Sequence, residues 1–215
     1  MKFDFSQPKE SKLYERLKPM AGAVIRLVFD VSCTGQENIP KNGGFIIAAN
    51  HIHFSDPILI IANCARTCHF MAKSELFSKP VLGSLLSKMN VFPVKRGASD
   101  KLSLGFAQRI IDNGWALGIF PEGTRSKSLM PQRAKNGVAY IAKKTKADVL
   151  PVSIYRTPGQ KSFRPKITLR FGELIKNEVL GLDEKYSQAQ LRAAAALIMG
   201  KITELWNMKH LILEG

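Results

Sequence analysis

The chain has 215 residues, 45% of them hydrophobic, which is enough apolar material to bury the core of an α/β domain and excludes a disordered polypeptide. Its formal net charge of +15 favours anionic partners: nucleic acid, acidic lipid headgroups or phosphorylated substrates. No run approaches the roughly 18 apolar residues of a membrane-spanning helix, and the first residues lack a signal-peptide core, so we expect neither spanning nor export. Cys33, Cys64 and Cys68 form no paired framework, which predicts buried thiols in a reducing compartment.

The first thirty residues predict a basic, amphipathic helical segment. Apolar side chains recur at steps of three and four residues, at Leu13, Leu17, Met20, Val24, Leu27 and Val31, with basic residues between them. Because proline fits poorly inside a helix, Pro19 predicts two helices or a kink, with Pro19 near the start of the second. The segment suits a membrane-surface anchor or a helix packed on the core. We therefore divide the chain into an N-terminal appendage, 1–33, and an α/β domain, 34–215.

After this segment, strand-like and helix-like stretches alternate with short connections, which is typical of an α/β fold. We predict strands at 31–35, 44–49, 67–72, 90–94, 115–120, 149–155 and 166–171. Helices are predicted after Asp56, from about 100 to 113, over 135–146, and from a capping box at Ser187 and Gln190. The expected architecture is a single domain with a mixed, mostly parallel sheet flanked by helices.

A histidine and an aspartate follow the apolar stretch 44–49. His51 can act as a general base, and Asp56, five residues on, can orient its ring if the loop folds back at a helix start. The alternative is that Asp56 only caps the helix and His51 is a surface residue. A metal shared by His51 and His53 is a further possibility. Because the only other histidines are His69 and His210, we expect no metal.

Two later segments offer cations for a phosphate. Lys95 and Arg96 follow a predicted strand and meet Gly97. In the second segment, 122–125, Gly123 and Thr124 allow a tight turn, and Arg125 can bind a phosphate bidentately. Glu122 could hold Arg125 or hydrogen-bond a substrate hydroxyl. The spacing is not that of a nucleotide-binding P-loop.

The ordered blocks 51–56, 95–97, 120–126 and 149–152 resemble those of the glycerolipid acyltransferases, over about residues 34–172. The subgroup that the chain resembles most is the 1-acylglycerol-3-phosphate, or lysophosphatidate, acyltransferases. One departure is His53, which stands where the family often has serine, and we expect it to pack structurally. The family also carries an N-terminal two-helix membrane motif, which the segment around Pro19 resembles.

The resemblance implies acyl transfer from acyl-CoA or acyl carrier protein to the sn-2 hydroxyl of lysophosphatidate, which gives phosphatidate. His51 would be the base and Asp56 its partner, and Pro151 would shape the acyl-binding part of the site. The phosphate and glycerol would be held by Lys95, Arg96, Gly97, Glu122, Gly123, Thr124 and Arg125. No cofactor is implied beyond the acyl donor.

The expected location is the cytoplasmic face of an anionic membrane, in a peripheral or monotopic arrangement. Glycerol 3-phosphate or another lysophospholipid is the alternative acceptor. A noncatalytic basic module that binds membrane or nucleic acid is a remote alternative. We expect no nucleic acid partner, because no aromatic residues alternate with the basic ones and no groove-reading helix is recognisable.

Overall fold

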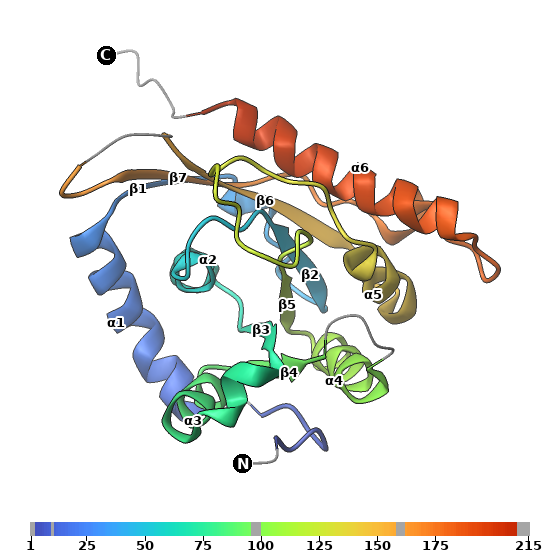
Figure 1. Cartoon of the computed structure of the whole chain (residues 1–215), viewed down its shortest axis with the longest axis horizontal. Helices are drawn as coiled ribbons and strands as arrows, with labels where there is room; N and C mark the ends of the chain where they lie inside the picture. Colours follow the sequence, from blue (N-terminus) through green and yellow to red (C-terminus); the bar gives the residue numbers. More distant parts are fainter. Residues whose placement is uncertain (1–2, 10, 96–99, 158–161, 210–215) are drawn as a thin grey trace.

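Seven strands form one sheet in the computed structural model, which describes residues 3–9, 11–95, 100–157 and 162–209 (Figure 1). The strands are β1 (Asp30–Thr34), β2 (Phe45–Ala49), β3 (Cys68–Lys73), β4 (Val91–Val94), β5 (Ala116–Ile119), β6 (Val149–Arg156) and β7 (Lys166–Phe171). Their order is β1-β7-β6-β2-β5-β3-β4, and every pair is parallel except the antiparallel β6 and β7. The predicted mixed, mostly parallel sheet is confirmed, with each strand within one residue of its predicted bounds.

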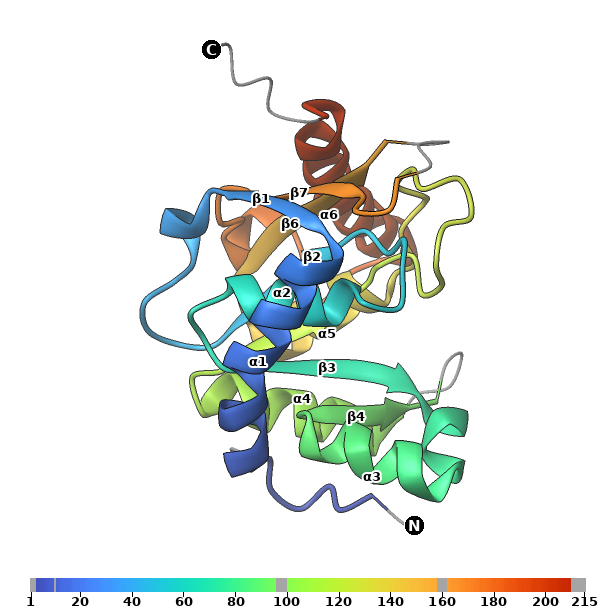
Figure 2. The ribbon, with the colours of Figure 1, turned by 90° about the vertical axis from the view of Figure 1, so that its left-hand side faces the viewer.

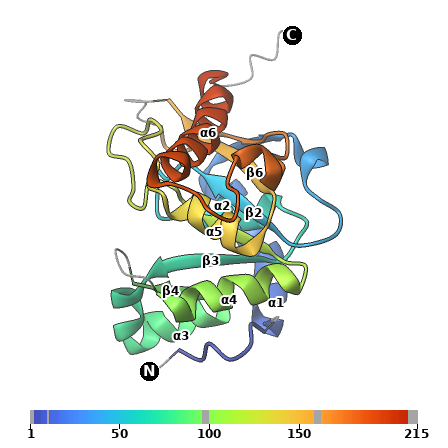
Figure 3. The same ribbon diagram turned by 90° about the vertical axis from the view of Figure 1, so that its right-hand side faces the viewer.

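Helices cover both faces of this sheet, so its central strands are apolar on both sides. One face carries α1 (Lys12–Val28), α2 (Asp56–Asn63) and α3 (Pro80–Lys88), and the other carries α4 (Lys101–Asp112), α5 (Gly137–Thr145) and α6 (Gln188–Asn207) (Figures 1 and 3). Along β2, Phe45 and Ile47 face the first layer and Ile46 and Ala48 face the second. Three short 3₁₀ helices, η1 (Gln36–Asn38), η2 (Ser74–Ser78) and η3 (Asn177–Leu180), lie in the connections.

The predicted helices are present, and one was missed. The helices expected after Asp56, after about residue 100 and over 135–146 are α2, α4 and α5. The capping box that begins α6 is confirmed, because the Ser187 N–H donates to Gln190 and the Gln190 N–H donates to Ser187. The sequence analysis placed no helix over α3.

The expectation of two separate helices around Pro19 is wrong, because α1 is one continuous helix with Pro19 inside it. Contacts on both sides of Pro19 hold the helix against the body (Figure 2), and these offset the backbone bond that proline cannot make. Before Pro19, the buried Tyr14 hydroxyl accepts from the Cys68 N–H at 3.0 Å, and after it Ile25 is buried in the core. Within the described part of the chain, no helix combines the length and apolar character needed to cross a membrane.

The predicted division between residues 33 and 34 is wrong, because it falls inside β1. This strand pairs with β7 along its whole length and is part of the sheet. Side chains of α1 and β1 pack into the same apolar cluster as those of α2 and β2. Helix α1 and strand β1 therefore belong to the α/β body and do not form a separate appendage.

A glycine in β5 makes room for an aromatic stack that leads to the carboxyl edge of the sheet. A Cβ on Gly118 would lie 2.2 Å from the ring of Phe70, a buried residue of β3. The Phe70 ring stacks on Phe120 at 5.8 Å, and Phe120 in turn stacks on His51 at 4.0 Å. The missing side chain at position 118 thus supports the position of a candidate catalytic ring.

We predict that Gly118→Ala lowers the free energy of unfolding by about 1–3 kcal/mol, because the added methyl group would overpack the buried Phe70 ring. Urea unfolding followed by circular dichroism measures the change. Gly200→Ala is the matched control. Gly200 lies in α6 with open space around it, so alanine there should raise stability by about 0.5–1 kcal/mol. Equal effects of the two substitutions would contradict the packing argument.

Candidate active site

His51 and Asp56 lie together at the carboxyl edge of the sheet. His51 follows β2 after one residue, and Asp56 is the first residue of α2. The loop between them folds back, so that His51 Nδ1 donates to Asp56 Oδ2 over 2.7 Å. The contact that the spacing predicted is confirmed.

The Asp56 carboxylate is held by the backbone as well as by the imidazole. Its Oδ2 also accepts the N–H groups of Ile52, at 2.7 Å, and His53, at 2.8 Å. Asp56 has no solvent exposure, whereas 18% of the His51 side chain remains exposed. Because Nδ1 donates to the carboxylate, the proton-accepting nitrogen of a neutral His51 is Nε2. This is the tautomer that a general base requires.

The segment 122–126 binds the backbone of His51 from the other side. The His51 N–H donates to Glu122 Oε1 at 3.0 Å, and the Ser126 N–H donates to the His51 carbonyl at 2.7 Å. Glu122 is 2% exposed and forms no ion pair with the exposed Arg125, so the expected role of holding Arg125 is wrong. The sequence analysis did not predict these two contacts with the His51 backbone, because nothing in the segments 51–56 and 120–126 indicates that their loops touch.

Burial gives Glu122 an unusual ionisation. The pKa of its carboxyl is raised to about 7, mainly by desolvation and in smaller part by the nearby Asp56 charge, while backbone N–H bonds from His51 and Gln132 oppose both. Its second oxygen, Oε2, is buried without a hydrogen-bond partner. A charge is costly at such a position, so the proton is retained well above the usual range of a glutamate.

Cationic side chains line a cavity whose wall includes Phe120, the residue that stacks on His51. Lys95 and Lys135 are exposed residues that line a cavity of about 680 Å³, and Lys101, which the sequence analysis did not single out, lines it as well. Gly123 has φ of 70°, as the predicted turn requires, and the Lys135 side chain lies against it. Thr124 and Arg125 are exposed on the same loop. Arg96 and Gly97, predicted to bind phosphate, lie outside the described residues.

The walls of this cavity are largely apolar. Eight of its lining side chains are hydrophobic or aromatic and come from β3, β4, β5, α4, α5 and α6: Met71, Val94, Leu104, Ile119, Val138, Tyr140, Ile141 and Leu191. Phe120 and Pro121 line it too, and the Phe120 ring is the one that stacks on His51. One carboxylate, Asp100, faces the three lysines, and it already accepts bonds from Lys95 N and Ser103. The site therefore offers an apolar chamber with a cationic rim next to the candidate base.

Two other predicted residues lie apart from the cavity. Pro151 is buried within β6, in register with Ala48 of β2, and is not on the cavity wall. His53 contacts the Phe29 ring at 6.2 Å, and its Nδ1 is bonded to Ser55 Oγ at 2.8 Å. Burial lowers the pKa of His53, so this imidazole is neutral at physiological pH. These contacts agree with the expected packing role of His53.

An α/β domain with a histidine and aspartate pair at the carboxyl edge of its sheet is a candidate acid–base enzyme. The family model described as Acyltransferase matches residues 30–155, which is more than half of the chain. The protein therefore belongs to the Acyltransferase family and is an enzyme.

Named relatives agree with this assignment. The 1-acyl-sn-glycerol-3-phosphate acyltransferase of Bacillus subtilis is 34% identical over 188 residues, which cover 86% of this chain and 92% of the relative. The enzyme of the same name from Borreliella burgdorferi is 35% identical over 58% of this chain and 50% of its own length. The crystal structure of the 1-acyl-sn-glycerophosphate (LPA) acyltransferase PlsC from Thermotoga maritima is similar with a TM-score of 0.71 and 28% identity, over 91% of this chain and 79% of that one.

The ionisation of Glu122 gives a testable pH dependence. Between the usual glutamate pKa of about 4.3 and its folded value of about 7, the native state keeps a proton that the unfolded state has lost. The free energy of unfolding should therefore fall as pH rises through this window. Glu122→Gln keeps the acceptor for His51 and removes the titration, so its stability relative to the wild type should rise between pH 5 and 8.

Urea unfolding at several pH values measures this difference. The control is Glu184→Gln, a replacement of an exposed glutamate, which should run parallel to the wild type. Parallel curves for Glu122→Gln would contradict the assigned ionisation.

Proposed function

We propose that the protein transfers an acyl group from an acyl thioester, of coenzyme A or acyl carrier protein, to the sn-2 hydroxyl of lysophosphatidate. The observation that carries this is the His51–Asp56 pair, whose imidazole stacks on Phe120, a wall residue of an apolar cavity with a cationic rim. The names of its relatives support the same acceptor.

In the proposed reaction, His51 Nε2 takes the proton of the acceptor hydroxyl as the oxygen attacks the thioester carbonyl. The tetrahedral centre then expels the thiolate, which takes a proton from the imidazolium. Asp56 stabilises the imidazolium through the 2.7 Å bond and fixes the ring. Because the carboxylate is already held by two backbone N–H groups, no side chain has to reorganise for the proton transfer.

The acceptor is an amphiphile, and the site offers both kinds of contact that it needs. Lys95, Lys135 and Arg125 supply charge for its phosphate, together with Arg96 outside the described residues. The apolar walls suit a fatty acyl chain, and a cavity of about 680 Å³ lies in the range typical of ligand sites. Glycerol 3-phosphate would use the cations and leave less of the apolar wall covered.

We predict that purified protein makes phosphatidate from lysophosphatidate and an acyl thioester, and that His51→Ala lowers the rate by about 10²–10⁴-fold because it removes the base. Asp56→Asn should also lower the rate while leaving the fold intact. Thiol release and diacyl product are measured together, with acyl-CoA and acyl carrier protein as separate donors.

The acceptor panel includes monoacylglycerol, which lacks the phosphate, glycerol 3-phosphate and other lysophospholipids. Transfer to one of these in preference to lysophosphatidate would keep the chemistry and change the substrate. No transfer with any acceptor, or full activity of His51→Ala, would refute the proposal.

We also propose that the enzyme docks peripherally on an anionic membrane through the outer face of α1. Four apolar residues on this face are 46–79% exposed, an unusual concentration for one helix: Met20, Val24, Leu27 and Val28. Exposed basic residues, Arg16 and Arg26, lie on the same helix. An apolar stripe flanked by cations is typical of helices that lie in the membrane interface.

The outer face of α1 lies close to the candidate active site. The helix starts near the amino end of β3, and the residue after it, Phe29, contacts His53 beside the catalytic pair. Arg164 Nη2 donates to the Arg26 carbonyl at 2.6 Å, which brings the connection that carries the fully exposed Phe163 to the same end of α1. Phe54, in the catalytic loop, is 68% exposed. Docking here would place the site at the surface that holds a lipid substrate.

Val24→Ser combined with Leu27→Ser should reduce sedimentation with vesicles that contain anionic phospholipid by about tenfold or more, because two apolar side chains no longer insert. Leu102→Ser with Val179→Ser is the matched control. Those side chains are similarly exposed but lie on α4 and η3. Equal losses for the two pairs, or no vesicle binding by the wild type, would contradict docking through α1.

A further inference from the structure

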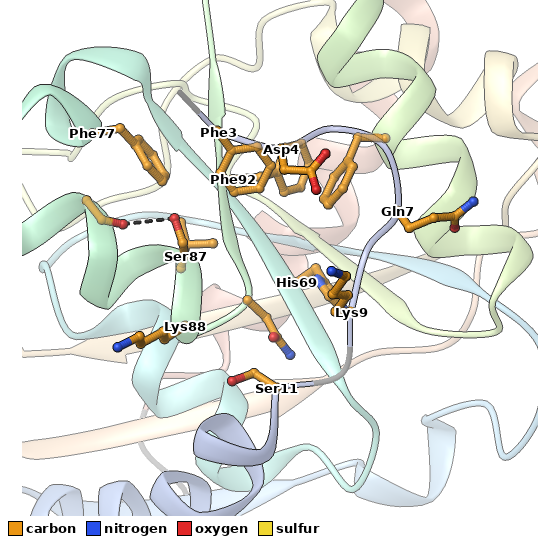
Figure 4. Close-up of a pocket in the computed structure, with 14 residues that line it drawn as sticks. Phe3, Asp4, Gln7, Lys9, Ser11, His69, Phe77, Ser87, Lys88 and Phe92 are labelled. Carbon is orange, nitrogen blue, oxygen red and sulfur yellow. Dashed lines mark hydrogen bonds between the residues drawn. The ribbon is translucent and has the colours of Figure 1, made fainter. Parts of the chain in front are cut away.

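The two ends of the sheet differ in what they offer a ligand. At the amino end, where Asn90 precedes β4, the phenylalanine rings of a cavity of about 420 Å³ pack on one another with centroids 5.0–5.9 Å apart (Figure 4). The unbonded polar atoms there, on His69 and Asn90, are buried. At the carboxyl end, Arg125 and Arg156 lie beside the catalytic loop, residues 50–55, and neither forms an ion pair within the described part of the chain.

Arg156 is tied closely to the catalytic loop. It is the last residue of β6, which runs parallel to β2. The side chain of Asn50, the residue before His51, donates to the Ile154 carbonyl at 2.9 Å and accepts from the Ile154 N–H at 2.7 Å. These two bonds hold the end of β6 against the start of the loop, so Arg156 has a fixed place beside it.

The position of Arg156 in the sheet places it on the face that carries α1. Ile154, two residues earlier, is buried in the apolar cluster of α1 and α2, and residues two apart in a strand share a face. Ile167, which pairs directly with Arg156 across β7, is buried in the same cluster. His53 is on this face too, because its ring contacts Phe29. Most of the apolar wall of the 680 Å³ cavity belongs to the opposite face.

Arg125 reaches the same place from the other side of the loop. It follows β5, and the strand order β6-β2-β5 puts the loop that carries His53 between the two arginines. Burial is the main cause of the lowered pKa of His53, and the charges of Arg156 and Arg125 lower it further, while the Asp56 charge opposes them. Because such effects fall off with distance, both guanidinium groups lie near His53.

These two charges have no counterion among the side chains that the structure describes. Arg125 is exposed, and Arg156 is half-buried with its Nε unbonded. The carboxylate of the loop, Asp56, already accepts three bonds on Oδ2. Two guanidinium groups near one another favour an anion between them, and phosphate oxygens match their geometry.

Apolar side chains lie next to this pair of arginines. The Phe54 ring is 4.2 Å from that of His53 and is 68% exposed. Phe163, in the connection that follows β6, is fully exposed, and the bond from Arg164 to Arg26 holds that connection against the end of α1. A phosphate bound here would therefore have apolar surface beside it for a lipid chain.

We propose that Arg156, together with Arg125, binds the phosphate of the lipid acceptor on the α1 side of the catalytic loop. The inference rests on the proposed transfer to lysophosphatidate and adds a binding residue to it. The acceptor would then approach His51 from the face through which α1 docks on the membrane. Arg156 would contribute to the choice of a phosphorylated acceptor over an uncharged one.

Steady-state kinetics with each substrate varied in turn tests the role of Arg156. Arg156→Ala should raise the KM for lysophosphatidate by about tenfold or more and leave the KM for the acyl donor unchanged, since a charge-assisted bond to one substrate is lost. Arg156→Lys should recover part of the loss, because the charge remains without the bidentate geometry. Arg192→Ala, at an exposed arginine of α6, is the matched control and should behave as the wild type.

Binding without a donor separates this inference from the proposed function. Titration calorimetry of the whole chain uses a short-chain lysophosphatidate, the matching monoacylglycerol and inorganic phosphate, and thermal unfolding shows that each variant is folded. Arg156→Ala should lose about tenfold or more in affinity for lysophosphatidate and show no change with monoacylglycerol. If this loss appears but no acyl transfer occurs with any acceptor, the phosphate site stands and the proposed function fails.

Three results would overturn the proposal while leaving acyl transfer intact. One is an unchanged KM and affinity for lysophosphatidate in Arg156→Ala. Another is a loss in Lys135→Ala that Arg156→Ala does not show, which would place the phosphate at the rim of the 680 Å³ cavity. The third is inorganic phosphate binding as tightly as lysophosphatidate, which would assign the arginines to free phosphate.

Discussion

One carboxylate oxygen organises the candidate active site. Asp56 Oδ2 accepts the imidazole N–H of His51 and the backbone N–H groups of the next two residues. A carboxylate with no solvent exposure is unfavourable unless it is bonded, and three donors on Oδ2 offset this cost, although Oδ1 is buried without a hydrogen-bond partner. The same contacts close the loop between β2 and α2, so the stability of the loop and the tautomer of the ring depend on one group.

The rest of the site holds this loop from outside. The Glu122 to Ser126 segment binds both backbone groups of His51, and the Phe120 ring lies flat against the imidazole. These contacts join parts of the chain about seventy residues apart, which meet because β2 and β5 are adjacent parallel strands. The edge where parallel strands end is the usual place for ligands in α/β folds. The site therefore forms only when the strands are ordered so that β2 and β5 are neighbours.

Cationic and apolar side chains lie together at two places in the molecule. Lysines line the rim of the apolar cavity of about 680 Å³, and the apolar stripe of α1, on the opposite side of the sheet, lies on the same helix as Arg16 and Arg26. A substrate with a phosphate and a long acyl chain needs both kinds of surface at once. The net charge of +15 also favours encounter with anionic lipid, since long-range attraction acts before any specific contact.

The sequence by itself determined the strands, the capping box of α6 and the pairing of His51 with Asp56, because each depends on residues close in the chain. Its prediction of two separate helices around Pro19 is wrong, because packing of α1 on α2 keeps the helix continuous where local preference favours a break. Tertiary structure alone decided that Glu122 binds the His51 backbone, that Pro151 lies away from the cavity, and that β1 joins the sheet. The contact of Glu122 with His51 and the pairing of β1 with β7 join residues far apart in the chain, and only the order of the strands brings them within bonding distance.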